Sequence, residues 1–553
     1  MTRKTIAFIL AASALAHIPC LSFQGQASGA NPRLVLVISI GQMRFDYLTR
    51  FAPLYKGGFR RLLDHGAIFD KAMVRHANTL TSPGNAVILS GRHPSHTGII
   101  ADRWYDVVSK KTVYAVDDPK QSPLGGTGTS SSPVNFLGPS LAEVLKKRSP
   151  QSKVVSVSLK DRAAILLAGP SGDAAYWYET NGGNFVTSSY YMSAVPPWLE
   201  KWNAQHFADQ FAGKPWTRLL SDEKVYQKFA GPDAVDGEWD RRETRFPHSI
   251  RAKPPLSRYY DDFRRTPFAD EMTLAVALEA LKAHRLGLDE STDILAVGFT
   301  ASDVIGHTYG ADSHEVMDEF LRLDLLLGKF FQELEDSVGL ARTLVILTSD
   351  HGSLPLVENL QAKGKEAQRA SPKDLESAVQ QALQSRFPGV HGLIAYYDAP
   401  NFYLDKELIR EHHLKQADVE SAVRSSLMST GLVEAVYDWS QLALETSSTD
   451  PYLQLFRNCL YPPRSPDLMV RLKKYIYLDD RIGGTGHGSP YDYDRHIPII
   501  FMGTGIEPGR YPRSCGPEDI APTLAKLLGF NYAREKDSRL LLEMMRSYSP
   551  SKP

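Results

Sequence analysis

The sequence predicts an α/β fold in which a mostly parallel central sheet is flanked by helices. Continuous apolar runs of strand length recur along the chain, and such runs are typical of strands buried on both faces of a parallel sheet. Segments with helical periodicity, such as 272–286 and 316–334, lie between the runs, and alternation of strands with helices indicates a sheet covered by helices. The apolar runs are 34–40, 154–157, 294–299, 344–347 and 497–501.

The composition agrees with a large globular protein and argues against a nucleic-acid partner. The 553 residues are 42% hydrophobic and 23% charged, which is enough apolar material for a large core. Basic and acidic residues number 63 each, so the formal charge is zero. A chain without net charge has no global field that attracts nucleic acid or a membrane surface.

The first 27 residues have the pattern of a signal peptide. Arg3 and Lys4 precede an apolar run over 6–16, and Gly25-Gln26-Ala27 is a suitable cleavage point. The apolar run is too short to span a bilayer. We therefore expect a periplasmic or secreted protein without a membrane anchor, consisting of one catalytic domain over residues 28–553.

Few cysteines remain after the signal peptide. Only Cys459 and Cys515 lie beyond it, and they do not form a cluster that suggests a thiolate metal site. In an oxidising compartment they have the chemistry to form one disulfide, but the sequence leaves their pairing open.

After the first run, the stretch 79–91 has the pattern of a hydroxyl nucleophile at the start of a helix. The sequence predicts that Thr81 or Ser82 caps the helix and that Pro83 occupies its first helical position. A helix start offers free N–H donors and partial positive charge, so it attracts an anion such as phosphate. A hydroxyl at this point therefore has an anion site beside it.

Polar side chains follow the next three runs. Lys160 and Arg162 follow the second run, Asp303 and His307 the third, and Asp350 and His351 the fourth. In open α/β sheets, ligands bind beyond the carboxyl ends of the strands. The sequence therefore predicts one site at that edge of the sheet.

Two long stretches interrupt the alternation of strands and helices. Residues 165–265 are rich in Trp, Tyr, Gly and Pro, and residues 355–480 contain helical patterns of their own. We predict that both are cap insertions that roof the site. The glycine-rich segment 483–489 then returns the chain to the site and carries His487.

The polar residues are of the kinds that bind zinc and phosphate. Imidazole and carboxylate groups both bind zinc at about 2.0–2.2 Å. Two metals would divide the work, one lowering the pKa of the Thr81 hydroxyl and the other stabilising the leaving oxygen. Lys160 and Arg162 would hold the equatorial oxygens of a phosphoryl group. The metal-type residues are Asp303, His307, Asp350, His351 and His487.

From about residue 33 to residue 531 the chain resembles the alkaline phosphatase superfamily, especially its periplasmic monoesterases with a Thr nucleophile and a Lys-x-Arg pair. The motifs that carry the resemblance are 42–48, Thr81-Ser82-Pro83-Gly84, 98–106, Ser158-Leu159-Lys160-Asp161-Arg162, Asp303 with His307, Ser349-Asp350-His351-Gly352 and Gly486-His487-Gly488. The resemblance implies that Thr81 attacks phosphorus and that water cleaves the resulting phospho-threonine.

The resemblance also implies two zinc sites. Asp303, His307 and His487 would bind one ion, and Asp350, His351 and Thr81 the other. Two positions depart from the family pattern. Gly41 stands where an Asp would complete the second zinc site, and Asp102 stands where an Asn would hydrogen-bond a phosphoryl oxygen.

These departures leave several hypotheses open. Asp102 turns to the metals and replaces the missing carboxylate, or the site holds one metal or none, or the substrate is less negative than a phosphate monoester. A sulfatase is excluded because Thr81 is not a precursor of formylglycine. The expected function is zinc-dependent hydrolysis of small phosphate monoesters. The alternatives are a phosphodiesterase of the same superfamily and a catalytically impaired phosphoester-binding protein.

Overall fold

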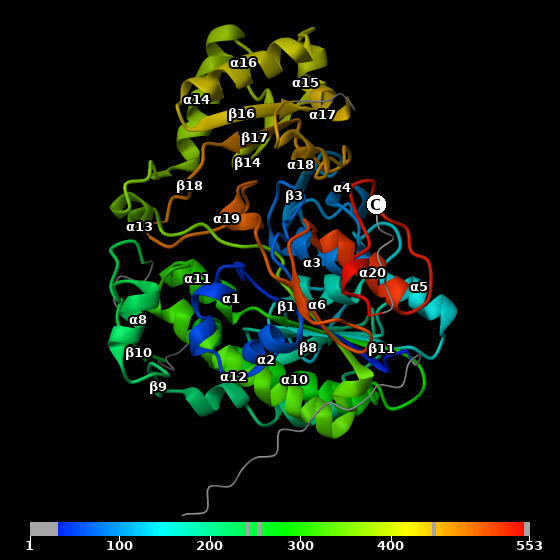
Figure 1. Ribbon diagram of the computed structural model, residues 1–553. Coiled ribbons are helices and arrows are strands. Elements are labelled where there is room, and N and C mark those ends of the chain that lie inside the picture. Colours follow the sequence, from blue (N-terminus) through cyan, green and yellow to red (C-terminus); the bar gives the residue numbers. More distant parts are fainter. Residues whose placement is uncertain (1–30, 239–242, 251–255, 445–448, 482, 547–553) are drawn as a thin grey trace, which may run out of the picture.

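The computed structural model describes residues 31–238, 243–250, 256–444, 449–481 and 483–546 (Figure 1). The predicted signal peptide lies outside these residues. None of the helices in the described part of the chain combines the length and the apolar character that a bilayer crossing requires.

A ten-stranded sheet forms the centre of the molecule and confirms the predicted α/β fold. Its middle strands run parallel, with β1 between β11 and β12 and with β6 and β7 beyond β11. Antiparallel pairs follow on both sides, through β19 on one and β8 on the other. The strand order is β20 (Gly509–Tyr511), β2 (Ala67–Phe69), β19 (Ile499–Gly503), β12 (Thr343–Thr348), β1 (Leu34–Ile40), β11 (Asp293–Phe299), β6 (Val154–Ser158), β7 (Ala174–Glu179), β8 (Asn184–Ser188) and β5 (Pro123–Leu124).

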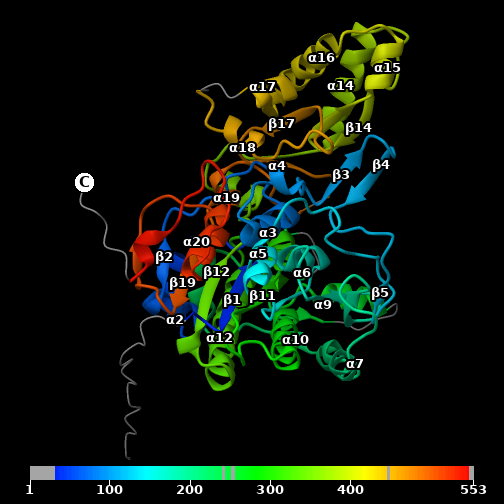
Figure 2. The same cartoon turned by 90° about the vertical axis from the view of Figure 1, so that its right-hand side faces the viewer.

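Helices cover both faces of the sheet because successive residues of β1 point to opposite faces. Leu36 and Ile38 belong to one buried cluster, which also contains residues of α10 (Phe268–His284) and α12 (His314–Ser337). Val35 and Val37 belong to another, with residues of α3 (Thr81–Ser90), α5 (Leu141–Arg148) and α20 (Ile520–Leu527). Figure 2 shows the sheet between these two helix layers.

The prediction that residues 165–265 roof the site is wrong. Residues 174–188 contain β7 and β8, which are strands of the central sheet. The aromatic residues beyond them pack into the same buried cluster as β1, among them Trp202, Trp216, Tyr226 and Tyr259. Burial in the main core, rather than an inserted cap, explains why this stretch is rich in Trp and Tyr.

Residues 357–478 include a module with its own sheet and core. The sheet order is β14 (Ile394–Asp398), β15 (Asn401–Leu404), β17 (Leu468–Leu472) and β16 (Val433–Asp438), and α14 (Pro372–Arg386) and α16 (Gln416–Ser429) supply buried residues to its core. We call residues 357–478 the insertion module. Figure 1 shows it at one end of the molecule, beyond the central sheet.

The two described cysteines are buried and are not joined by a disulfide. Cys459 lies in a small buried cluster with Tyr437 and Met469 of the insertion module. Cys515 lies in the buried cluster that also contains residues of α20. Both therefore serve as small apolar residues, and burial raises the pKa of the Cys459 thiol to about 12.

Candidate active site

The strand ends bring the expected side chains together. Lys160 follows β6, and Asp303 and His307 lie on α11 (Ala301–Tyr309), the helix that follows β11. Asp350 and His351 follow β12 directly. Because β6, β11 and β12 belong to the parallel part of the sheet, their carboxyl ends share one edge.

Asp303, His307 and His487 place their ligand-type atoms within 4.8 Å of one another. Positions i and i+4 put Asp303 and His307 on the same face of α11. Asp303 Oδ1 lies 3.6 Å from Nε2 of both His307 and His487, and 3.8 Å from Nε2 of His351. This oxygen is buried and accepts no hydrogen bond from the described residues. A buried carboxylate oxygen faced by three imidazole nitrogens fits a metal ion.

Backbone carbonyls orient all three imidazoles. The Nδ1 atoms lie 2.7 Å from Thr485 O for His307, 2.7 Å from Thr79 O for His487 and 2.9 Å from Gly352 O for His351. A ring that donates Nδ1–H to a carbonyl leaves Nε2 as a lone-pair donor for a metal. These carbonyl partners were not predicted, because only the folded chain brings the loops together.

The protonation of the cluster suits metal binding. Burial lowers the pKa of His351 to about 4. Burial and the neighbouring imidazoles of His351 and His307 also hold the pKa of His487 well below its usual value. Burial opposes ionisation of Asp303, but the charge of Lys160 and the imidazoles outweigh it and keep that pKa well below the ordinary range. Neutral imidazoles and an ionised carboxylate are the forms that bind zinc.

The second predicted metal group is incomplete. Asp350 Oδ2 lies 3.5 Å from His351 Nε2, while Oδ1 accepts hydrogen bonds from the amides of Gln42 (3.2 Å) and His351 (2.9 Å). Burial raises the pKa of Asp350 to about 6. Gly41 contributes no carboxylate, and a Cβ at this position would lie 3.1 Å from Asp303 Cβ.

Thr81 begins α3 beside these residues. Its Oγ1 lies 3.5 Å from His351 Nε2 and 3.4 Å from Lys160 Nζ. The prediction that Thr81 or Ser82 caps the helix is wrong, because Leu80 is the N-cap residue and makes no side-chain cap. Pro83 is accordingly the third residue of the helix and not the first, the position that the sequence predicts. The carboxylate of Asp102 performs the role of a capping side chain, because it accepts a hydrogen bond from the Ser82 amide at 2.8 Å. The Thr81 hydroxyl is thereby turned toward His351 and Lys160.

The carboxylate of Asp102 lies between the helix start and Arg162. Its Oδ2 is 3.2 Å from Arg162 Nε. Burial opposes ionisation of Asp102, but Arg162 and the Ser82 amide outweigh it and lower the pKa of the carboxyl group. Among the described residues, the carboxylate oxygens of Asp102 make no hydrogen bond with Asp350 and no ion pair with His351; their partners are Ser82 and Arg162. The hypothesis that Asp102 replaces the carboxylate missing at Gly41 therefore has no support in this geometry.

Lys160 also forms an ion pair with a carboxylate of the protein. Its Nζ lies 2.5 Å from Asp303 Oδ2, and the two side chains are almost fully buried. Both cations of the Lys-x-Arg pair thus face acidic groups of the chain itself.

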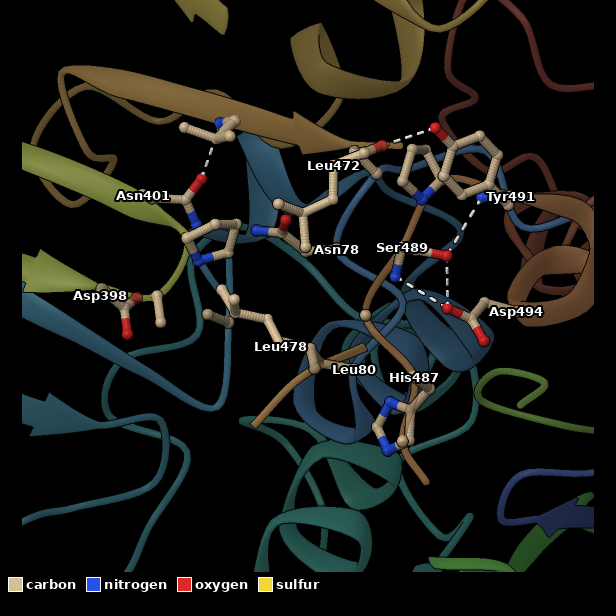
Figure 3. A pocket seen from close by; sticks show the side chains of 18 of the residues that line it. Asn78, Leu80, Asp398, Asn401, Leu472, Leu478, His487, Ser489, Tyr491 and Asp494 are labelled. Atoms are coloured by element: carbon tan, nitrogen blue, oxygen red, sulfur yellow. Dashed lines mark hydrogen bonds between the residues drawn. The ribbon is translucent and has the colours of Figure 1, made fainter. Parts of the chain in front are cut away.

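A cavity of about 360 Å³ opens beside His487, between the catalytic core and the insertion module (Figure 3). The core contributes Asn78 and Leu80, and the insertion module contributes Asp398, Asn401 and Leu478. Sequence reasoning did not find these residues, since they come from distant segments and form no short motif.

The chain is similar to known proteins over most of its length. Residues 35–492 match the family model described as type I phosphodiesterase / nucleotide pyrophosphatase. Alkaline phosphatase PafA of Elizabethkingia meningoseptica is 32% identical over 91% of this chain and 92% of its own length. Alkaline phosphatase PhoK of Sphingomonas sp is 32% identical over 92% of this chain and 91% of its own.

A solved structure matches nearly the whole fold. The crystal structure of wild-type alkaline phosphatase PafA has a TM-score of 0.87 and 31% identity, and the match covers 94% of this chain and 100% of that one. The central sheet and the insertion module are therefore shared with a known architecture.

Proposed function

Because the chain belongs to the type I phosphodiesterase / nucleotide pyrophosphatase family of the alkaline phosphatase superfamily, we propose that it hydrolyses phosphate monoesters with Thr81 as the nucleophile. One observation carries this proposal. Thr81 Oγ1 is within 3.5 Å of both His351 Nε2 and Lys160 Nζ, at the start of a helix. A hydroxyl in that position has both an anion site and a group that assists its deprotonation.

The reaction proceeds in two displacements. Thr81 Oγ attacks phosphorus, the phosphorus–oxygen bond to the alcohol breaks, and the alcohol leaves with the electron pair of that bond and takes up a proton. The product on the protein is phospho-threonine. Water then attacks the same phosphorus, which releases phosphate and restores the threonine hydroxyl. The α3 amides and the positive charges of Lys160 and Arg162 act on the phosphoryl oxygens in both steps.

The donor set fits zinc at two sites of unequal strength. Asp303, His307 and His487 would hold the stronger ion, and Asp350, His351 and Thr81 the weaker one. Bound zinc supplies positive charge that favours the threonine alkoxide and the leaving oxygen. Gly41 removes one carboxylate from the weaker site, so we infer that this site fills only at higher zinc concentration.

Asp102 favours a second candidate function. An ionised carboxylate beside Arg162 repels the dianion of a monoester, by about 4 kcal/mol at ~4 Å and an intermediate dielectric. A phosphodiester carries one charge fewer and meets less repulsion. The second candidate is therefore a phosphodiesterase, and a protein that binds phosphoesters without turnover is the third.

The expected substrate is a small phosphate ester, and the pattern over residues 1–27 supports an exported enzyme. The test is hydrolysis of an aryl phosphate monoester and of the matching diester at increasing zinc concentrations, with Thr81→Ala as the control. Faster release from the monoester, absent in the control, supports the monoesterase. Faster release from the diester supports the second candidate. No release from either overturns both and leaves the binding protein.

A further inference from the structure

The cavity beside the site is large enough for the alcohol part of a substrate. Its volume is about 360 Å³, and His487 lines one end of it. Figure 3 shows His487 below and Asp398, Asn401 and Leu472 of the insertion module above. Thr81 itself does not line the cavity, but Leu80, Asp102 and His487 do, so the space begins next to the position proposed for the phosphoryl group.

One face of the hairpin formed by β14 and β15 is directed toward the catalytic core. Alternation along β14 places Tyr396 and Asp398 on the same face, and Tyr396 pairs across the hairpin with Tyr403. Tyr396 stacks on Tyr105 of the catalytic core, with ring centroids 5.0 Å apart and planes 9° apart. The opposite face, with Phe402, packs into the core of the insertion module. Asp398 therefore belongs to the face that meets the catalytic core and the cavity.

Asp398 is an acidic group without a partner. In the described ranges, no donor hydrogen-bonds to its carboxylate and no cation lies at ion-pair distance from it. Desolvation by burial is what raises the pKa of Asp398, to about 6. Asp398 is half-buried, so its carboxylate is partly desolvated, and such a charge without a partner among the described residues gains when a ligand supplies the opposite charge.

The other charged groups that line the cavity have partners or lie at its rim. Asp102 faces Arg162, and Asp494 accepts hydrogen bonds from the amide and the hydroxyl of Ser489. The guanidinium of Arg103 lies 4.7 Å from the centre of the Tyr114 ring. Lys473 is largely exposed. The acidic group that remains available to a ligand in the cavity is Asp398.

We propose that the cavity is a subsite for the alcohol part of the ester, and that Asp398 selects alcohols that carry a protonated amine. The inference rests on the proposed function, because it assumes that the phosphoryl group lies at Thr81. An ammonium group can pair with Asp398 and lie against the ring of Tyr403, which also lines the cavity. A neutral alkyl chain of equal length would leave the carboxylate unpaired.

The test measures binding, so that it does not depend on turnover. Calorimetric titration of the full-length Thr81→Ala protein compares ω-aminoalkyl phosphates of two to eight carbons with n-alkyl phosphates of the same length. At the chain length that reaches Asp398, we expect the amine to bind at least tenfold more tightly, as for a charge-assisted hydrogen bond. Adding Asp398→Asn should remove the difference, while Asp418→Asn, at an exposed position of the same module, should keep it.

Equal binding of the two series at every length, or a preference that survives Asp398→Asn, would overturn the subsite. Lack of binding by both series would overturn it as well. Hydrolysis by the unmodified protein is measured separately. A preference for the amine without hydrolysis would keep the subsite and reject the proposed function, and hydrolysis without the preference would do the reverse.

Discussion

Arg162 Nε lies 3.2 Å from Asp102 Oδ2, so the guanidinium expected to hold a phosphoryl oxygen already holds a carboxylate. The same carboxylate accepts a hydrogen bond from the Ser82 amide at the start of α3. One acidic side chain thus occupies the Ser82 amide as a hydrogen-bond acceptor and forms an ion pair with the Arg162 guanidinium. We expect this arrangement to limit the negative charge of a substrate.

Replacing Asp102 by Asn should increase monoester hydrolysis. The amide oxygen can still accept the Ser82 amide, while the negative charge beside the phosphoryl group is gone. From a repulsion of about 4 kcal/mol we expect kcat/KM for an aryl phosphate monoester to rise by one to three orders of magnitude. The diester rate should rise much less. Asp106→Asn, at the end of the short strand β3 (Arg103–Asp106) that follows Asp102, is the matched control. A fall in the monoester rate for Asp102→Asn would contradict the role given to the Asp102 charge.

Placing Asp at position 41 should strengthen the weaker metal site. The new carboxylate would complete the group around Asp350 and His351, although its Cβ would come within 3.1 Å of Asp303 Cβ. Metal analysis after dialysis against low zinc should give about one ion for the unmodified protein and a higher value for Gly41→Asp. Gly41→Asn has similar size and no charge, and serves as the control. An identical zinc content in all three proteins would refute the role given to Gly41.

Substitutions of the neighbouring residues Thr81 and Ser82 should have very different effects on turnover. Thr81→Ala removes the hydroxyl beside His351 and Lys160, and we expect turnover to fall by at least about a thousandfold. The Ser82 hydroxyl is buried and has no hydrogen-bond partner among the described residues, so Ser82→Ala should keep most of the rate. Acid quenching and mass spectrometry should detect phosphate on Thr81. Phosphate on any other residue would show that the nucleophile is misassigned.

A pair of buried acids beneath the site should make stability depend on pH. Asp270 accepts the amides of Thr300 and Ala301 at the start of α11, and Glu319 of α12 lies against it. Burial raises the pKa of Asp270 to about 7 and, with the help of Asp270, raises that of Glu319 well above its usual value. The folded protein thus holds protons that the unfolded chain releases near pH 4.

That contribution to stability is complete below about pH 4 and is lost as the pH rises through 7 and beyond. We expect the free energy of unfolding to decrease between pH 5 and pH 9, and we expect that decrease to be smaller in Glu319→Gln. Urea unfolding at fixed zinc concentration checks this. Glu333→Gln, at an exposed position of α12, should leave the slope unchanged; an unchanged slope in Glu319→Gln would mean that the pair is not protonated in the fold.

Features set by short stretches of sequence were predictable. The apolar run 34–40 is β1 as expected. The runs near 294 and 344 are its parallel neighbours β11 and β12, and the run near 154 is β6, which pairs in parallel with β11. The polar residues after these runs meet at one edge of the sheet because a strand end fixes where the next residues lie. Local sequence was sufficient for these elements.

Features set by contacts between distant segments were not predictable. The cap of α3 comes from Asp102, twenty residues away in the chain, rather than from the hydroxyls at the helix start. The composition of residues 165–265 predicts a roof over the site, yet Trp216 and Tyr226 of this stretch are buried in the main core. The role proposed for Asp398 leaves no motif in the sequence, since it depends on the absence of a partner among the described residues.

The carbonyls that orient His307, His351 and His487 belong to the backbone of Thr485, Gly352 and Thr79. Every amino acid carries such a carbonyl, so a substitution at these three positions changes a side chain but deletes no acceptor. The acceptors of the three rings therefore do not depend on the identity of a side chain. At Gly352 the space around the backbone sets a separate limit, because a Cβ there would clash with the backbone oxygen of Tyr493. The orientation of the three rings is thus independent of the residues at positions 41 and 102, where the chain departs from the pattern that it resembles.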